Sequence, residues 1–211
     1  MTPRLLAAAS LATLALAGCA TVPAERLDSV SATAEVPAAP AIPQATGYFA
    51  TDSALPYHAP DFTKVAEGDY RPAFEQGMAI QRAEVAAITA NRDAPTFANT
   101  ILALENSGKL LGRVGRVFYA LTGANTTDAL DAIDEEMSPK LAAHSDAINL
   151  DPALFARVKA VYDNRSSLTG EDLRLTERTY EEMVHAGAML TPEQRERVKA
   201  INGELSTLAT Q

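Results

Sequence analysis

The sequence predicts an all-α protein. Residues 70–211 repeat apolar side chains at the three- and four-residue spacing of amphipathic helices, and no alternating apolar and polar run is long enough for a useful strand. Helix start and stop signals divide this pattern into segments. Hydrophobic residues make up 47% of the 211 residues, which is enough for a substantial core. We therefore expect several helices that pack around buried apolar faces.

The first residues predict a lipoprotein-type signal peptide over residues 1–18. Arg4 precedes an apolar stretch over residues 5–17, and Gly18 and Cys19 follow it in the order typical of a lipidation signal. Cys19, the single cysteine of the chain, is the predicted lipid-attachment residue. An ordinary cleaved signal with an incidental cysteine is the alternative.

Residues 19–46 predict a flexible linker. They are rich in alanine and proline and contain few large apolar side chains, so burial cannot offset the entropy lost on ordering them. Residues 16–19 resemble the lipidation signal of bacterial lipoproteins, and this resemblance implies the outer membrane, because Ala20 follows the cysteine where an aspartate would favour retention in the inner membrane. We therefore expect an exported protein in the periplasm or cell envelope, anchored to the outer membrane through Cys19.

The body spans residues 47–211. The sequence of its first part predicts an extended arm and then a helix. Prolines disfavour a helix over residues 47–67, and the aromatic side chains of this arm are expected to pack on the helical body. Asp69 is a candidate cap for a helix over residues 70–91. The apolar stripe expected to face the core is Phe74, Met78, Val85 and Ile88.

The stretch from Thr96 to Thr122 predicts a buried helical pair. Thr96 is placed to cap the first helix, and Gly108 can adopt the left-handed conformation that ends one. Gly123 is expected to end the second helix. The apolar positions of the pair are Phe97, Ile101, Leu104, Leu111, Val114, Phe118 and Leu121.

Further helices are expected up to residue 211. Thr126 or Thr127 should start a helix over residues 128–148, and Pro139 should kink or divide it. The later starts and stops are Asp151 to about Arg165, Gly170 to Gly187, and Thr191 to residue 211. In the last helix Leu205 and Leu208 are expected to leave an apolar face exposed.

Several short motifs occur along the chain in an order that resembles the thimet oligopeptidase family of zinc peptidases, in particular its bacterial peptidyl-dipeptidases. The likeness covers roughly Gly47 to the end of the sequence. The residues that carry it are Leu55–Tyr57, Arg71–Met78, Thr96–Ile101, Ala103–Gly108, Ser138–Leu141 and Ala200–Leu208.

The resemblance implies the N-terminal lobe of a larger, mostly helical, two-lobed peptidase with a deep channel. The N-terminal helices of this family form part of one channel wall, which admits short peptides. The catalytic lobe supplies two histidines and a glutamate as zinc ligands and a second glutamate as the general base, and the enzyme releases C-terminal dipeptides. The implied partners of this region are therefore short peptides and the missing catalytic lobe, with zinc bound only in the full-length enzyme.

The residues themselves provide no catalytic or metal-ligating set. A zinc hydrolase of this type needs H-E-x-x-H, and none of His58, His144 and His185 is followed by glutamate. Glu182 and His185 have the E-x-x-H spacing of di-iron bundles, but the other required ligands are missing and a solvated helix face is the ordinary interpretation. We predict no catalytic residue and no metal ligand in this chain.

Charge and the remaining polar residues narrow the functional classes. A net charge of −9 without clustered lysine and arginine argues against a nucleic-acid partner. Arg113 and Arg116 could pair with a substrate carboxylate, although surface groups or ion-pair partners are commoner.

Two hypotheses remain. The first is the N-terminal region of an exported zinc peptidyl-dipeptidase, truncated before its active site. The second is a self-contained helical lipoprotein that binds a periplasmic peptide or protein partner through an exposed apolar groove.

Overall fold

The computed structural model describes residues 41–210, so the predicted signal peptide, Cys19 and nearly all of the predicted linker lie outside the described residues. The prediction of an all-α body is confirmed, because residues 41–210 form helices and turns without a strand. The α-helices are α1 (Tyr70–Ala90), α2 (Ala103–Glu105), α3 (Lys109–Asn125), α4 (Asp128–Asn149), α5 (Pro152–Asp163), α6 (Gly170–Ala186) and α7 (Pro192–Leu208). None of the helices in this range is both long enough and apolar enough to cross a bilayer.

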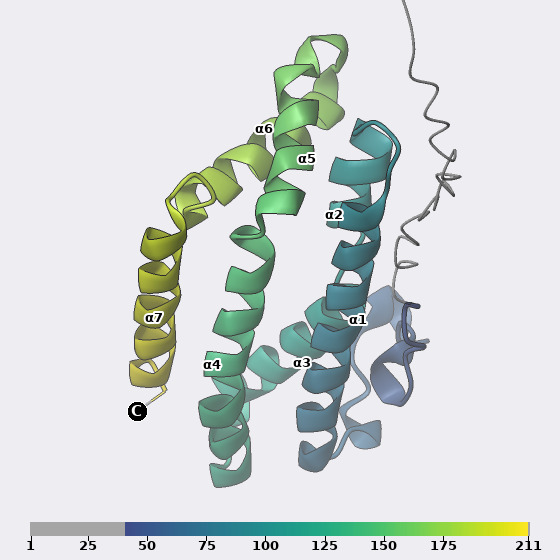
Figure 1. Cartoon of the computed structure of the whole chain (residues 1–211). Coiled ribbons are helices and arrows are strands. Elements are labelled where there is room, and N and C mark those ends of the chain that lie inside the picture. The colour runs from purple at the N-terminus through teal and green to yellow at the C-terminus, as the bar shows by residue number, and fades with distance from the viewer. Residues whose placement is uncertain (1–40, 211) are drawn as a thin grey trace, which may run out of the picture. The chain divides into compact units, whose positions relative to one another are not determined.

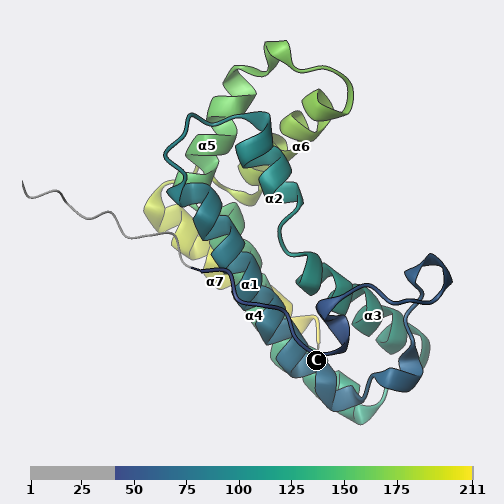
Figure 2. The ribbon, with the colours of Figure 1, turned by 90° about the vertical axis from the view of Figure 1, so that its right-hand side faces the viewer.

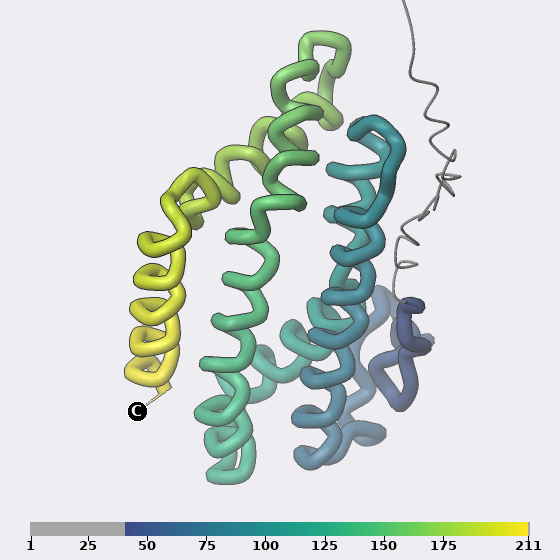
Figure 3. Tube along the Cα trace, viewed as in Figure 1, coloured from purple at the N-terminus to yellow at the C-terminus, as the bar shows by residue number. Residues whose placement is uncertain are grey.

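The helices pack in a small number of pairs. α1 contacts both α3 and α4, α4 contacts α7, and α5 contacts α6. α4 therefore lies between α1 and α7, as Figures 1 and 3 show. The arm before α1 consists of short 3-10 turns, and Figure 2 shows it running along α1 and then around α3.

Side chains close the helix ends as the sequence predicts. The Thr96 hydroxyl accepts from the Asn99 amide at 3.2 Å, and the Asn99 side chain accepts from the Thr96 amide at 2.8 Å. This reciprocal cap starts a π-helical turn, η5 (Phe97–Leu102), that leads directly into α2. Asp151 and Thr191 cap α5 and α7 in the predicted way. Gly108 and Gly187 occupy the left-handed region at the predicted breaks.

Two groups of buried apolar side chains hold the body together. The first joins the arm with α1, α3 and α4, and its aromatic rings form a connected series. The ring centroids of Tyr70 and Phe118 are 5.2 Å apart, as are those of Phe74 and Phe118, and Phe49 of the arm lies 5.6 Å from Tyr70. The second group joins α1, η5, α5 and α6 around Ile101, Leu154 and Val158.

The contact between α1 and α3 depends on a glycine. A Cβ atom at Gly77 would lie 2.9 Å from the Cα atom of Leu111, which is closer than two carbon atoms can pack. The absence of a side chain at Gly77 therefore allows the two helix backbones to approach and lets Phe74 and Phe118 meet.

Two local predictions were wrong, those at Asp69 and Gly123. Asp69 does not cap α1; its carboxylate accepts from the Ala66 amide at 2.8 Å, because a 3-10 turn already leads into the helix. α3 continues through Gly123 to Asn125, because that glycine has an ordinary helical conformation rather than a left-handed one. Of the two outcomes expected at Pro139, a kink or a division of the helix, division does not occur, because α4 is continuous from Asp128 to Asn149.

The arm and the last helix expose more apolar surface than the rest of the body. In the arm Phe49 is buried, but Leu55, Tyr57 and Phe62 are exposed, so only part of the predicted aromatic packing forms. In α7 Leu205 and Leu208 are 58% and 65% exposed, which confirms the predicted apolar face, and Ile201 extends it. α7 meets α4 through smaller and polar groups, including Asn202, which donates to Asp146 at 2.8 Å.

Gly77→Ala is expected to destabilise the protein by about 1–3 kcal/mol, because the added methyl group must push α1 away from the α3 backbone. Gly123→Ala is the matched control, since nothing lies within 4 Å of its Cβ position and alanine should stabilise the helix by about 0.5 kcal/mol. Urea denaturation of both variants measures the difference. Equal effects of the two substitutions would show that the close helix contact does not limit stability.

Candidate functional site

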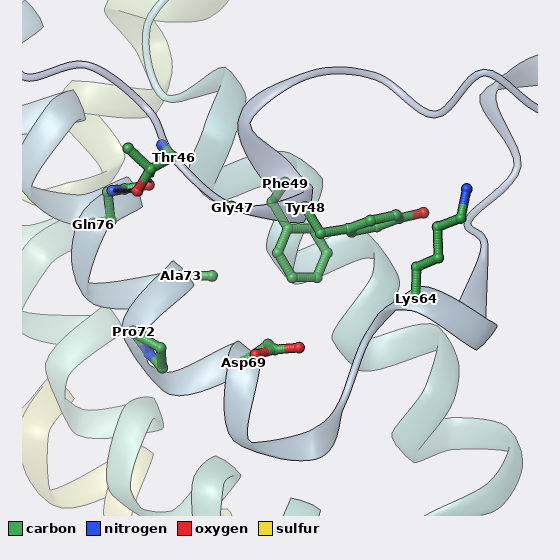
Figure 4. Close-up of a pocket in the computed structure, with 9 residues that line it drawn as sticks. All are labelled: Thr46, Gly47, Tyr48, Phe49, Lys64, Asp69, Pro72, Ala73 and Gln76. Carbon is green, nitrogen blue, oxygen red and sulfur yellow. Dashed lines mark hydrogen bonds between the residues drawn. The ribbon is translucent and has the colours of Figure 1, made fainter.

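The arm, which in the structure comprises residues 46–69, creates two hollows on the surface of the helical body. The first has a volume of 290 Å³ and lies between the arm and the start of α1 (Figure 4). On one side Gln76 exchanges two hydrogen bonds with Thr46, of 3.0 and 2.8 Å. On the other side Tyr48 accepts from the Asp61 amide at 2.7 Å. These hydrogen bonds hold the arm in place, so we interpret the residues of this hollow as structural.

The second hollow, which we call the arm–α3 pocket, has a volume of 420 Å³. Its charged and aromatic lining comes from the arm and from one face of α3. The residues concerned are Tyr48, Phe49, Asp52, Tyr57, His58, Arg113 and Arg116.

Arg113 fixes the arm to α3. Its Nε donates to Asp52 at 2.8 Å, and one Nη donates to the carbonyl oxygen of Phe49 at 2.6 Å. The hydrogen bond and the positive charge of Arg113 hold the pKa of Asp52 below its usual value, and the charges of His58 and Arg116 act in the same direction. Of the two arginines that the sequence singled out, Arg113 is therefore an ion-pair partner that positions the arm.

Arg116 lies one helical turn further along α3 and lines the same pocket. Within residues 41–210 its guanidinium makes no salt bridge, and the residue is exposed. It remains available for an external anion, as the sequence analysis allowed.

The three histidines occupy separate environments. His58 contacts the carbonyl oxygen of Ser53 through Nδ1 at 2.9 Å. His144 is buried, and its Nε2 contacts Gln81 at 2.8 Å. His185 is exposed on α6, where the neighbouring carboxylate of Glu182 is occupied by Arg178 at 2.6 Å. The described part of the chain brings together no group of three or more histidine, cysteine, aspartate or glutamate side chains suited to a metal ion.

Arg157 is a buried polar residue that the sequence analysis missed. It donates to the carbonyl oxygens of Asn91 and Asp93, at 2.7 and 3.3 Å, and to the side chain of Asn99 at 3.1 Å. It thereby ties α5 to the loop before η5. The signal was its place on α5 beside buried Leu154 and Val158, where a charged side chain must find partners.

Comparison with known proteins shows which proteins the chain is similar to. No protein-family profile matches the chain. It is 47% identical over 165 residues to the dipeptidyl carboxypeptidase of Escherichia coli strain K12, and 48% identical over 161 residues to that of Salmonella typhimurium strain LT2. The chain is related to the bacterial dipeptidyl carboxypeptidases. This confirms the resemblance found in the sequence.

The match is extensive in this chain but partial in the relatives. It covers 77% and 75% of this chain and 24% of each dipeptidyl carboxypeptidase, so the matched region spans about a quarter of the length of these relatives. The names of these relatives describe a peptidase activity of the complete proteins. What this chain contributes to such an activity depends on its own residues.

Stability is expected to fall as the pH drops below about 6.5, partly through His144. Burial is the main cause that lowers the pKa of His144 from its ordinary value of 6.5, with the positive charge of Arg82 adding to it. Below pH 6.5 the unfolded chain therefore takes up a proton that the folded chain resists, so the free energy of unfolding decreases.

The slope due to this one group should not exceed about 1.4 kcal/mol per pH unit. His144→Gln should reduce the loss of stability between pH 7 and pH 5, whereas His185→Gln, at an exposed position, should leave it unchanged. Urea denaturation at a series of pH values measures both. A His144→Gln profile identical to that of the parent chain would contradict the assignment.

Proposed function

We propose that residues 47–211 are the N-terminal region of an exported, zinc-dependent peptidyl-dipeptidase. In this role they form part of the wall of the channel that admits short peptides. The observation that carries the proposal is the 47–48% identity, over about three quarters of this chain, to two dipeptidyl carboxypeptidases. An all-helical body without a catalytic constellation fits a wall better than a reaction centre.

The residues that the structure describes, 41–210, do not fit a zinc ion. The only three histidines of the chain lie in different environments, and two of them already contact Ser53 and Gln81. Glu182, which has the helical spacing to His185 that a ligand pair requires, is paired with Arg178. In the proposed enzyme zinc is therefore held by residues outside this region, and no step of the reaction is assigned to the residues described.

The exposed face of α7 is the surface proposed to contact the catalytic lobe. Ile201, Leu205 and Leu208 recur at helical spacing, and each is more than a third exposed. Together they give one side of the helix an apolar stripe. Burial of this stripe contributes about 25 cal/mol of stabilising free energy per Å² of apolar surface removed from water. The proposal also includes lipid attachment at Cys19 and anchoring to the outer membrane. The order of the residues in the signal peptide is the support for this part.

Purified on its own, this 211-residue chain is expected to hydrolyse no peptide. Short peptides with a free C-terminus are incubated with the chain and with added Zn²⁺, and released dipeptides are measured by mass spectrometry. No hydrolysis is expected because the described residues contain no ligand set for zinc. Release of C-terminal dipeptides that a chelator abolishes would overturn this prediction.

A chimera tests the wall role directly. Residues 47–211 replace the matching segment of the E. coli dipeptidyl carboxypeptidase, to which the chain is 47% identical. The chimera is expected to release C-terminal dipeptides at a rate within about tenfold of its parent, because the same helical wall is restored.

Leu205→Glu in the chimera should lower activity, because it places a charge in the proposed contact with the catalytic lobe. Thr207→Glu is the control, since it adds the same charge to another exposed face of α7. In the isolated chain both variants should be as stable as the parent. A folded but inactive chimera would favour the alternative, a self-contained helical lipoprotein that binds a periplasmic peptide or protein partner through an exposed apolar groove.

A further inference from the structure

The arm–α3 pocket carries an unbalanced positive charge. Asp52 and Arg113 form an ion pair of 2.8 Å and cancel one another. Arg116 lines the same pocket and makes no salt bridge within residues 41–210. The charge of Arg116 still reaches Asp52, because it contributes to lowering the pKa of that carboxyl group. The pocket therefore has one surplus cation.

The two arginines are held on the same side of α3. They are three residues apart, so their side chains are neighbours on the helix surface and repel one another. Arg113 cannot move away, because Asp52 and the carbonyl oxygen of Phe49 fix its guanidinium at 2.8 and 2.6 Å. An anion between the two guanidinium groups relieves this repulsion and gains charge-assisted hydrogen bonds.

The rim of the pocket is built from backbone in an unfavourable conformation. Tyr57 and His58 have φ angles of 60° and 56°, in the left-handed region that residues other than glycine seldom occupy. Two consecutive residues of this kind cost on the order of 1–3 kcal/mol each. The His58 contact with Ser53, of 2.9 Å, helps to hold this loop, and the Tyr57 side chain is fully exposed at the pocket. Strain of this kind is a recurring feature of ligand-binding segments.

The size and lining of the pocket define the ligand. Its volume of 420 Å³ falls within the range of small-molecule sites. Tyr48, Tyr57, Val117 and Ala120 give it an apolar wall. One surplus cation matches a single negative charge better than a phosphate dianion, and the wall matches an apolar group beside that charge.

We propose that the arm–α3 pocket binds a carboxylate attached to an apolar group. Arg116 pairs with the carboxylate, Arg113 presents its remaining guanidinium edge to it, and the apolar group lies against Tyr57 and Val117. A free organic acid and the C-terminus of a short peptide share this chemistry. Binding of such a ligand does not depend on the proposed peptidase role.

The first experiment compares acids with their neutral amides on the full chain. Isothermal titration calorimetry uses 3-phenylpropionate and N-acetyl-alanyl-phenylalanine, each beside its amide. The acids are expected to bind and the amides to bind at least about tenfold more weakly, with affinity decreasing as salt is added. Binding of only the peptide or only the free acid identifies the source of the carboxylate. No binding of either acid at millimolar concentration, or equal binding of acids and amides, would overturn the proposal.

Two variants of the pocket should change affinity in opposite directions. Arg116→Gln removes the surplus cation and should weaken binding of the acids by about tenfold or more. Asp52→Asn removes the competing carboxylate while keeping a hydrogen-bond acceptor for Arg113, so it should strengthen binding. Arg174→Gln, at an exposed arginine of α6, is the control and should leave affinity unchanged. Because damage to the arm would weaken binding in both pocket variants, a loss of affinity in each, with circular dichroism unchanged, would contradict the assignment.

Discussion

The close approach of α1 and α3 at Gly77 is the constraint on which the first core group depends. Glycine at this position lets the backbone of α1 lie against Leu111, where a Cβ atom would come within 2.9 Å of its Cα atom. That spacing brings Phe74 and Phe118 into edge contact at 5.2 Å, and it allows Phe49 of the arm to join the same group through Tyr70. The position of the arm therefore depends on the contact between α1 and α3, although the arm is part of neither helix.

The arm in turn creates the pocket. Arg113 projects from α3 and holds the arm by Asp52 and by the carbonyl oxygen of Phe49, and the space left between arm and helix becomes the arm–α3 pocket. The two arginines lie on one helix face, and their roles overlap only in part. Arg113 fixes the arm and presents its remaining guanidinium edge to the proposed ligand, whereas Arg116 makes no salt bridge within residues 41–210 and supplies the surplus charge. The names of the related dipeptidyl carboxypeptidases assign no role to this pocket.

Local signals in the sequence predicted much of the fold. Caps at Thr96, Asp151 and Thr191 and the breaks at Gly108 and Gly187 were found because each acts through residues a few positions away. The predictions failed at Asp69 and Gly123, where the neighbouring turn or helix decides whether a potential signal is used, and Pro139 does not divide α4. The family resemblance was also found in the sequence, because short motifs in a fixed order can be recognised without knowing which residues they contact. Export and lipid attachment at Cys19 stay predictions, since they rest on residues outside those described.

By itself the sequence determined the helical class, most helix boundaries and the absence of an H-E-x-x-H motif, because periodicity, caps and motifs are local properties of the chain. Only the tertiary structure decided that Arg113 and Arg116 face a common pocket with Asp52 and His58, which are more than fifty residues away in the sequence. It also decided that Arg157 is buried among loop carbonyl groups. Such pairings are set by which helix faces pack together, and no spacing within a single helix records the partner across the contact.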